Sequence, residues 1–502
     1  MNQPVGKNVR SVSAEVQAML DASKQESTLS KGTAAMRAAG EEYLPKEPAE
    51  EHQDYANRLA RSTLFNGLGK TVEDMSGKVF AKPVKLAEDA PEEFRGKFVK
   101  EGDDEKLVAP GIVENIDMAG RGLNNFAYDV FADGMVRGIS YILVEMPPPL
   151  TDANGQPRTV VSKAEAAAAK RRPYFCHLTL DALLGWQTEE ENGVTYLSQL
   201  RVLEVVKEPD PNNEWEKKSV EQVKVYRRTA AGVTWETYRK KDGNGTGGEA
   251  IWMIHDEPTP IVGPTEIPLA VFYAKRTGFM TAAPPLKKLG DINVAHWQSA
   301  SDQRNILHVA RVPILFGAGF TESDKLVVSA NTFTKASDPA ASLQWVEHSG
   351  SAIGAGRDDL NDLIFQMQTL GLELLIPKPG GDSATGAAID DAKMNAPLAI
   401  MADNLGDALE IAFKFAAQFA GMGEDMGGTV VVNKDFGVSM RDSTDITALL
   451  SAVTAGKLSR ETFWSELLRR GVLKEGFNPE VEKDRIEDDP QDLGTIGREP
   501  TE

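Results

Sequence analysis

The stretch from Pro173 to Lys275 constrains the fold most, because apolar and polar residues alternate along it. The alternation is clearest in VTYLSQLRVLEVV, VKVYRRT and VTWETYRK. These strings are followed in turn by the clusters PDPNN, AAG and DGNGTGG, which are rich in turn-forming residues. A period of two turns one face of a strand toward a core and the other toward solvent, and Gly, Pro, Asn and Asp favour chain reversals. We therefore predict a strand-rich segment over 172–280.

Helical periodicity dominates on both sides of this segment. Apolar residues recur at helical spacing over 55–80, 117–138 and 385–420. The second of these helices is expected to end at Gly134 or Gly138, and the following ISYILVEM reads as a buried strand. Because 502 residues exceed what one core usually holds, the sequence predicts an α+β chain of several modules.

A further helix is expected from Pro285 to Pro313, since it holds no Gly or Pro after Gly290. PILFGAGF then reads as a short strand, and Gly350, Gly354 and Gly356 predict a mobile loop over 347–358 before helix resumes. Four basic residues lie on or beside the first helix: Lys287, Lys288, Arg304 and Arg311. They are read either as a limited positive charge that opposes the acidic chain or as a solvated helix face, and we favour the solvated face.

The charge balance limits the partners of the chain. With 75 acidic and 55 basic side chains the net charge is −20, which disfavours sequence-specific DNA binding through phosphate contacts. The single cysteine, Cys176, excludes a disulfide within the chain and fits a reducing cytoplasm. The amino terminus lacks the layout of a signal peptide, and no long apolar stretch predicts a membrane span.

Motifs for catalysis and cofactors are incomplete. Residues 66–71, NGLGKT, end like a phosphate-binding loop, but Leu64 stands where its first glycine belongs, so we favour a connection between helices. Gly317 and Gly319 follow a strand, yet Glu322 replaces the third glycine of a dinucleotide fingerprint. The six histidines never occur at metal-binding helical spacing. We predict no catalytic residue, cofactor or metal.

Several strings, read in order, resemble the portal proteins of tailed bacteriophages, the ring subunits that connect head and tail. The likeness spans roughly 40–475. Its strings are EEYLPKEPAEEHQDYANRLARSTLFNGLGKTVEDMSGKVFAKP, NIDMAGRGLNNFAYDVFADGMVRGISYILVEMP, RRPYFCHLTLDALLGWQ, PPLKKLGDINVAHWQSASDQRNILHVARVPILFGAG and GLELLIPKPGGDSATGAAID. No single string is a mechanistic motif, so the resemblance depends on their shared order.

The resemblance implies a portal fold of wing, stem, clip and crown with long tunnel-lining helices, assembled as a dodecameric ring. The strand-rich segment would belong to wing or clip. The modules implied are an N-terminal helical arm and wing over 1–165, the strand-rich wing or clip segment over 172–280, a stem helix with adjoining clip over 283–345, a tunnel loop and wing helices over 346–440, crown-like helices over 441–475 and a flexible acidic tail over 476–502.

The resemblance also implies sites and partners. Lys287, Lys288, Arg304 and Arg311 would be channel-facing stem residues. The DNA-facing tunnel loop would comprise Ser349, Gly350, Ser351, Ala352, Ile353, Gly354, Ala355, Gly356 and Arg357. The implied partners are further copies of the chain, major capsid and scaffolding proteins, the terminase large subunit, head-to-tail adaptor or tail proteins, and double-stranded DNA that passes without sequence specificity.

The implied function is a non-enzymatic channel for DNA packaging and ejection at one vertex of the virion, made in the host cytoplasm. The alternatives are another virion component, such as a minor capsid or adaptor protein, and a nucleotide-dependent packaging enzyme. The enzyme would need a complete phosphate-binding loop around Lys70.

Overall fold

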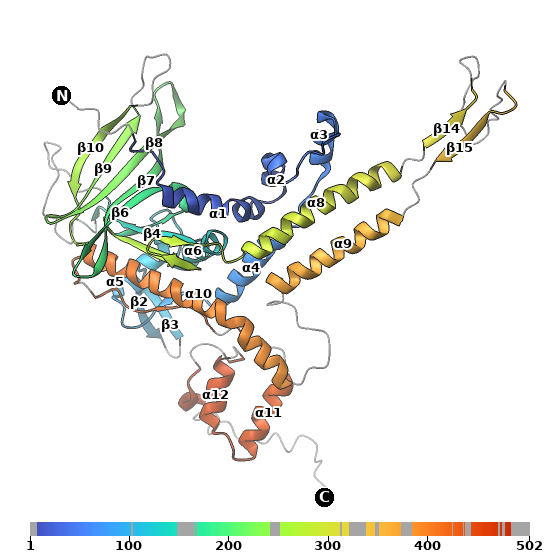
Figure 1. The fold of residues 1–502 in the computed structure, drawn as a ribbon. Coiled ribbons are helices and arrows are strands. Elements are labelled where there is room, and N and C mark those ends of the chain that lie inside the picture. Colours follow the sequence, from blue (N-terminus) through green and yellow to red (C-terminus); the bar gives the residue numbers. More distant parts are fainter. Residues whose placement is uncertain are drawn as a thin grey trace, which may run out of the picture. The chain divides into compact units, whose positions relative to one another are not determined.

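The structure is a computed structural model of the chain. Helices and strands are mixed along it, which confirms the predicted α+β class (Figure 1). Among the residues described, no helix is both long and apolar enough to cross a bilayer. Those residues are 8–101, 104–147, 165, 168–240, 251–311, 314–320, 338–346, 351–372, 384–423, 425–434, 436, 443–469, 472–473 and 477–482.

The chain divides into two compact units, and each unit is built from three separate stretches. The first comprises Met1–Gly77, Tyr128–Glu145 and Cys176–Gly380, and the second comprises Lys78–Ala127, Met146–Phe175 and Gly381–Glu502. The six continuous segments expected from the sequence therefore do not correspond one to one with the units. Their assignment to wing, stem, clip and crown stays a prediction.

A five-stranded antiparallel sheet, ordered β10-β9-β8-β7-β6, forms the strand-rich part of the first unit. It confirms the predicted strands, with reversals at PDPNN and AAG. Its inward face buries Leu200, Val202 and Tyr226 in one core, as the alternation requires. The strands are β6 (Leu183–Glu191), β7 (Val194–Asp210), β8 (Asn213–Thr229), β9 (Gly232–Lys240) and β10 (Trp252–Pro260).

A three-stranded sheet, ordered β11-β4-β5, lies in the same unit. Its central strand β4 (Ile139–Glu145) is buried almost throughout, as predicted for ISYILVEM. Helix α6 (Leu123–Arg137) leads into β4 and ends before Gly138, the second of the two expected ends. The remaining short elements are β5 (Tyr174–Leu178), η3 (Leu180–Ala182), β11 (Leu269–Tyr273), β12 (Arg276–Gly278) and β13 (Thr281–Ala282).

Short helices make up the N-terminal part of the first unit. The periodic segment 55–80 is divided, because Asn66 Oδ1 accepts a hydrogen bond from the Gly69 amide at 2.9 Å and caps a new helix. The helices are α1 (Ala14–Ser30), α2 (Thr33–Ala39), η1 (Gly40–Glu42), α3 (His52–Arg61) and α4 (Gly67–Val79).

Two long helices, α8 (Lys287–Ala310) and α9 (Ser351–Met367), lie side by side and antiparallel in the first unit (Figure 1). The antiparallel strands β14 (Ile314–Ala318) and β15 (Ser342–Val346) occur between them in the chain. The helix predicted after Pro285 and the strand predicted in PILFGAGF are thus confirmed. A π-helical turn, η4 (Gln368–Leu372), follows α9.

The second unit is organised around the long helix α10 (Ala384–Phe419). Phe413 of α10 packs against Phe94 and Phe175, with ring centroids 5.8 and 5.0 Å away. Phe477, near the start of the acidic tail expected over 476–502, packs on Trp464 with the two ring centroids 6.0 Å apart. This part of the tail is therefore packed, and residues 483–502 lie outside those described. Further elements are β1 (Lys85–Leu86), α5 (Glu92–Arg95), β2 (Lys97–Glu101), β3 (Asp104–Ala109), η2 (Ile112–Asn115), β16 (Val430–Val431), α11 (Ser443–Thr454) and α12 (Arg460–Arg469).

The side chain of Glu26, on α1, is fully buried next to α8. Neither carboxylate oxygen accepts a hydrogen bond from a described residue, although Lys287 Nζ lies 3.3 Å from Oε1 as an ion pair. Burial raises the pKa of Glu26 above its ordinary value, despite the opposing charge of Lys287. The protonated carboxyl of Glu26 therefore contributes its full stability at pH values below the ordinary pKa of glutamate. This contribution is lost as the pH rises through the raised pKa of the folded state.

We therefore expect Glu26→Gln to raise the thermal unfolding midpoint at neutral pH and to leave it unchanged in acid. The amide removes the buried negative charge while it keeps the shape of the side chain. Calorimetry of both proteins between about pH 4 and pH 8 measures the difference. A variant that is less stable than the parent at neutral pH would show that the ion pair with Lys287 outweighs the desolvation of Glu26.

Candidate functional site

The packing of α8 against α9 depends on polar and small residues. Gln303 Nε2 donates to the Ile353 carbonyl at 2.9 Å, and Ser299 Oγ donates to Asp359 Oδ2 at 2.6 Å. A Cβ atom at Gly356 would lie closer than 3.0 Å to Gln303 Oε1. The absence of a side chain at Gly356 therefore allows α9 to approach α8 closely.

The expected tunnel loop coincides with the start of α9. Ser349 and Gly350 lie outside the described residues, whereas Ser351 to Arg357 form the first turns of the helix. The expectation of a loop is therefore wrong from Ser351 onward. A glycine inside a helix costs only about 1 kcal/mol, and the packing of α9 along α8 offsets that cost. That these residues face DNA stays a prediction.

The four expected stem cations separate into two groups. Lys287 and Lys288 begin α8, and the Lys287 ammonium is paired with Glu26 at 3.3 Å and with Asp291 at 3.8 Å. Arg304 lies 17 residues beyond Lys287, which on a helix corresponds to roughly 26 Å. The four residues therefore cannot form one site. Arg304 and Arg311 lie at the far end of α8, away from Lys287 and Lys288.

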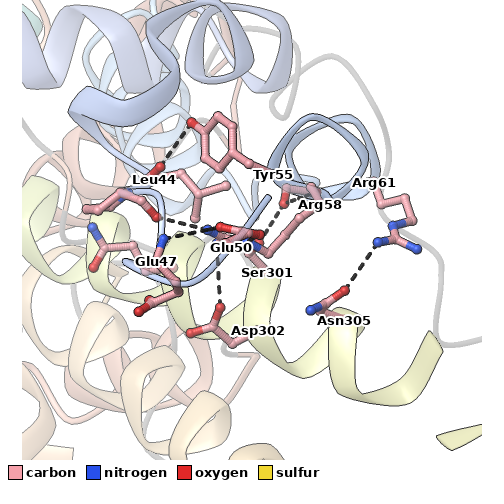
Figure 2. A network of polar contacts seen from close by, with 12 residues as sticks. Leu44, Glu47, Glu50, Tyr55, Arg58, Arg61, Ser301, Asp302 and Asn305 are labelled. Atoms are coloured by element: carbon pink, nitrogen blue, oxygen red, sulfur yellow. Dashed lines mark hydrogen bonds and ion pairs between the residues drawn. The ribbon is translucent and has the colours of Figure 1, made fainter. Parts of the chain in front are cut away.

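Arg304 and Arg311 lie beside a third arginine, Arg61, at the end of α3. Arg304 Nη1 donates to the Arg61 carbonyl at 3.2 Å and to Thr63 Oγ1 at 2.6 Å. Arg61 Nη2 donates to Asn305 Oδ1 at 3.2 Å, a contact that Figure 2 shows. The three arginines line a cavity of about 490 Å³, which we call the arginine cavity; its lining is Arg61, Arg304, Leu307, His308 and Arg311. No pattern in the sequence pointed to Arg61.

A buried ionic network fixes α3 on α8 next to the arginine cavity (Figure 2). The Arg58 side chain is 4% exposed, and its Nε and Nη2 atoms donate to Glu50 Oε1 and Oε2, each at 2.7 Å. Arg58 Nη1 lies 3.6 Å from Asp302 Oδ1 on α8, and Ser62 Oγ donates to Ser301 Oγ at 2.8 Å. The hydrogen bond from Arg58 lowers the pKa of Glu50, so the pair is ionised at neutral pH.

A serine, a histidine and an aspartate meet elsewhere in the first unit without forming a catalytic triad. Ser140 Oγ lies 2.8 Å from His177 Nε2, and Asp133 Oδ2 lies 3.6 Å from that same nitrogen. A triad requires the carboxylate at the other ring nitrogen, where it orients the base. Ser140 is also fully buried, so its hydroxyl is inaccessible to a substrate.

Another cluster of ionisable residues joins β4, β7 and β8. Lys224 Nζ pairs with Glu145 and lies 3.8 Å from Glu204 Oε1, and its charge faces the Trp235 ring at 5.0 Å from the centroid. Burial raises the pKa of the neighbouring Cys176 thiol, so that residue is not an activated nucleophile. We interpret the cluster as packing within the sheet core.

The two nucleotide motifs are not assembled. Around residues 66–71, the Leu68 amide donates to Asn293 Oδ1 at 3.0 Å, and Lys70 pairs with Asp74, so these groups are engaged within the protein. The strand before Gly319, β14, pairs antiparallel with β15, and Glu322 lies outside the described residues. In the part of the chain that the structure describes, no group of three or more His, Cys, Asp or Glu side chains could hold a metal ion.

Comparisons with known proteins give a match to a sequence family and matches to solved structures. Residues 285–420, which include α8 and α9, match a family described as domain of unknown function (DUF4055). A chain in the neck of an empty gene transfer agent particle is 10% identical over 81% of this chain and 89% of its own, with a TM-score of 0.38. A chain in the virion of a native particle is 11% identical over 83% and 88%, with a TM-score of 0.35. No curated protein matches the sequence.

Proposed function

We propose that this chain is a portal protein, a non-enzymatic ring subunit at one vertex of a virion through which DNA is packaged and ejected. The proposal is carried by the antiparallel helix pair α8 and α9. Helix α8 lies within the portal-like string that begins PPLKKLGDINVAHWQ, and the string that begins GLELLIPKPGG follows α9 in the chain. The 24 residues of α8 correspond to roughly 36 Å of uninterrupted helix. Such helices, repeated around an axis, can form the wall of a channel.

The charge of the chain supports a channel more than a tight DNA-binding surface. A net charge of −20 per subunit repels phosphates over most of the surface, so that DNA can slide without strong adhesion. The proposed ring contains twelve copies. Its proposed partners are major capsid and scaffolding proteins, the terminase large subunit and head-to-tail adaptor or tail proteins, and the DNA would pass without sequence specificity.

The first test is the assembly state of the purified full-length chain. Native mass spectrometry and negative-stain imaging, at several protein and salt concentrations, are expected to show a closed ring with a central hole. A monomer or dimer under every condition would overturn the proposal, and an open filament would contradict closure of the ring.

The alternative functions differ in what they require. A minor capsid or adaptor protein would bind head or tail proteins without DNA passing through a ring of this chain. A nucleotide-dependent packaging enzyme would hydrolyse ATP in a manner that depends on Lys70. The pairing of Lys70 with Asp74 and the amide contact of Leu68 with Asn293 disfavour the enzyme.

A further inference from the structure

We propose that the arginine cavity is a phosphate-binding site, in which Arg61, Arg304 and Arg311 bind the oxygens of a phosphate group. The inference goes beyond the portal proposal, since it concerns the chemistry of one subunit and holds whether or not a ring forms. Its ligand class is phosphate, either free as phosphate or pyrophosphate, or as the phosphodiester of a nucleic acid.

The geometry suits an oxyanion. The cavity, of about 490 Å³, has room for a pyrophosphate with water, and three of its five lining side chains are guanidinium groups. The planar fork of a guanidinium donates two parallel hydrogen bonds to a phosphate. Arg304 and His308 are four residues apart, so they lie on one face of α8. Arg311 directly follows α8, and its amide donates to the Leu307 carbonyl at 3.2 Å, which continues the helical turn.

The positive charge of the cavity is not neutralised within the described part of the chain. Arg61 and Arg304 donate only to neutral acceptors there, namely backbone carbonyls, the Thr63 hydroxyl and the Asn305 amide oxygen. Arg311 is exposed and has no carboxylate partner among those residues. Arg58, one helical turn before Arg61, is by contrast fully engaged by Glu50. An external anion is therefore the remaining counter-charge for the three arginines.

The cavity is also held in shape before a ligand arrives. Thr63 and the Arg61 carbonyl fix the Arg304 guanidinium, and Asn305 fixes that of Arg61. The Arg58 network holds the two helices together. Groups that are already ordered lose less conformational entropy on binding. Two of the three guanidinium groups are therefore ordered before a phosphate binds.

The test compares the full-length protein with the double variant Arg304→Gln/Arg311→Gln. Both changes are at exposed positions and remove charge from the cavity. Lys288→Gln is the matched control, because it removes an exposed cation from the other end of α8. Calorimetric titration with inorganic phosphate and pyrophosphate forms one arm. Fluorescence anisotropy with a DNA duplex of about 20 base pairs, at several salt concentrations, forms the other.

We expect the double variant to weaken binding of pyrophosphate or of the duplex by at least about tenfold and the control by less than about twofold. If the double variant binds both the small anions and the duplex more weakly, the site accepts any phosphate. If it binds only the duplex more weakly, and the duplex affinity depends less steeply on salt concentration, the site binds the phosphates of the DNA backbone. Arg304→Lys/Arg311→Lys should retain part of the affinity, which separates charge loss from misfolding. Equal binding by parent and double variant overturns the proposal. If the double variant also loses self-assembly while its binding of phosphate and DNA is unchanged, the arginines contact carboxylates of another subunit instead.

Discussion

Replacing Arg58 with methionine is expected to lower the free energy of unfolding by about 3 to 5 kcal/mol. Methionine keeps an unbranched stem but removes the charge, so Glu50, whose side chain is 11% exposed, loses both of its 2.7 Å hydrogen bonds. The Pro45 carbonyl loses its donor as well. Urea and thermal unfolding of the purified chain measure the loss, because removal of one partner leaves a nearly buried charge uncompensated.

The effect should depend on pH. Arg58 lowers the pKa of Glu50, so the stabilisation is present above the ordinary pKa of that carboxyl and is lost as the pH falls through the lowered value. Arg61→Met, one helical turn away, is the matched control and should cost less than about 1 kcal/mol, since its contacts are to neutral groups at the surface. A second variant, Arg58→Met with Glu50→Leu, should recover much of the loss. Equal costs for Arg58→Met and Arg61→Met would contradict a stabilising role for the network.

The parts of the fold that the sequence predicted are those whose signals are local. The strands β7, β8 and β9 follow from alternation interrupted by PDPNN and AAG, and α8 follows from an unbroken helical pattern. Periodicity and turn positions depend on residues that are close in the chain, so a single sequence contains these signals. The discontinuous units could not be predicted in this way, because long-range contacts decide which separate stretches pack together.

The site was harder to predict for the same reason. Arg61 and Arg304 are 243 residues apart, and no periodicity links them. The glycines at 354 and 356 predicted a loop because glycine usually disfavours helix, whereas Gly356 is explained by its closeness to Gln303 on another helix. Only Arg304 and Arg311, four and three residues from His308, could be placed on one helix face from the sequence.

Gly138→Ala is the second substitution with a large expected effect, a loss of about 2 to 5 kcal/mol in the free energy of unfolding. Gly138 ends α6 with a φ of 89°, a conformation that costs an L residue about 1 to 2 kcal/mol. A Cβ there would also lie closer than 3.0 Å to the Ala283 carbonyl oxygen. The backbone cannot move freely to relieve this clash, because the Gly138 carbonyl accepts from the Ala274 and Lys275 amides at 2.9 and 3.2 Å.

Gly193→Ala separates the two contributions. Gly193 lies in the turn between β6 and β7 with a φ of 80°, and a Cβ there would meet no atom within 4 Å. It should therefore show the cost of the left-handed conformation alone, about 1 to 2 kcal/mol, and Gly138→Ala should exceed it by the cost of the clash. Thermal unfolding of both variants under one set of conditions measures the difference. If the two midpoints fall equally, the contact with Ala283 is relieved by movement of the segment after β13, and the end of α6 is less tightly packed than the structure shows.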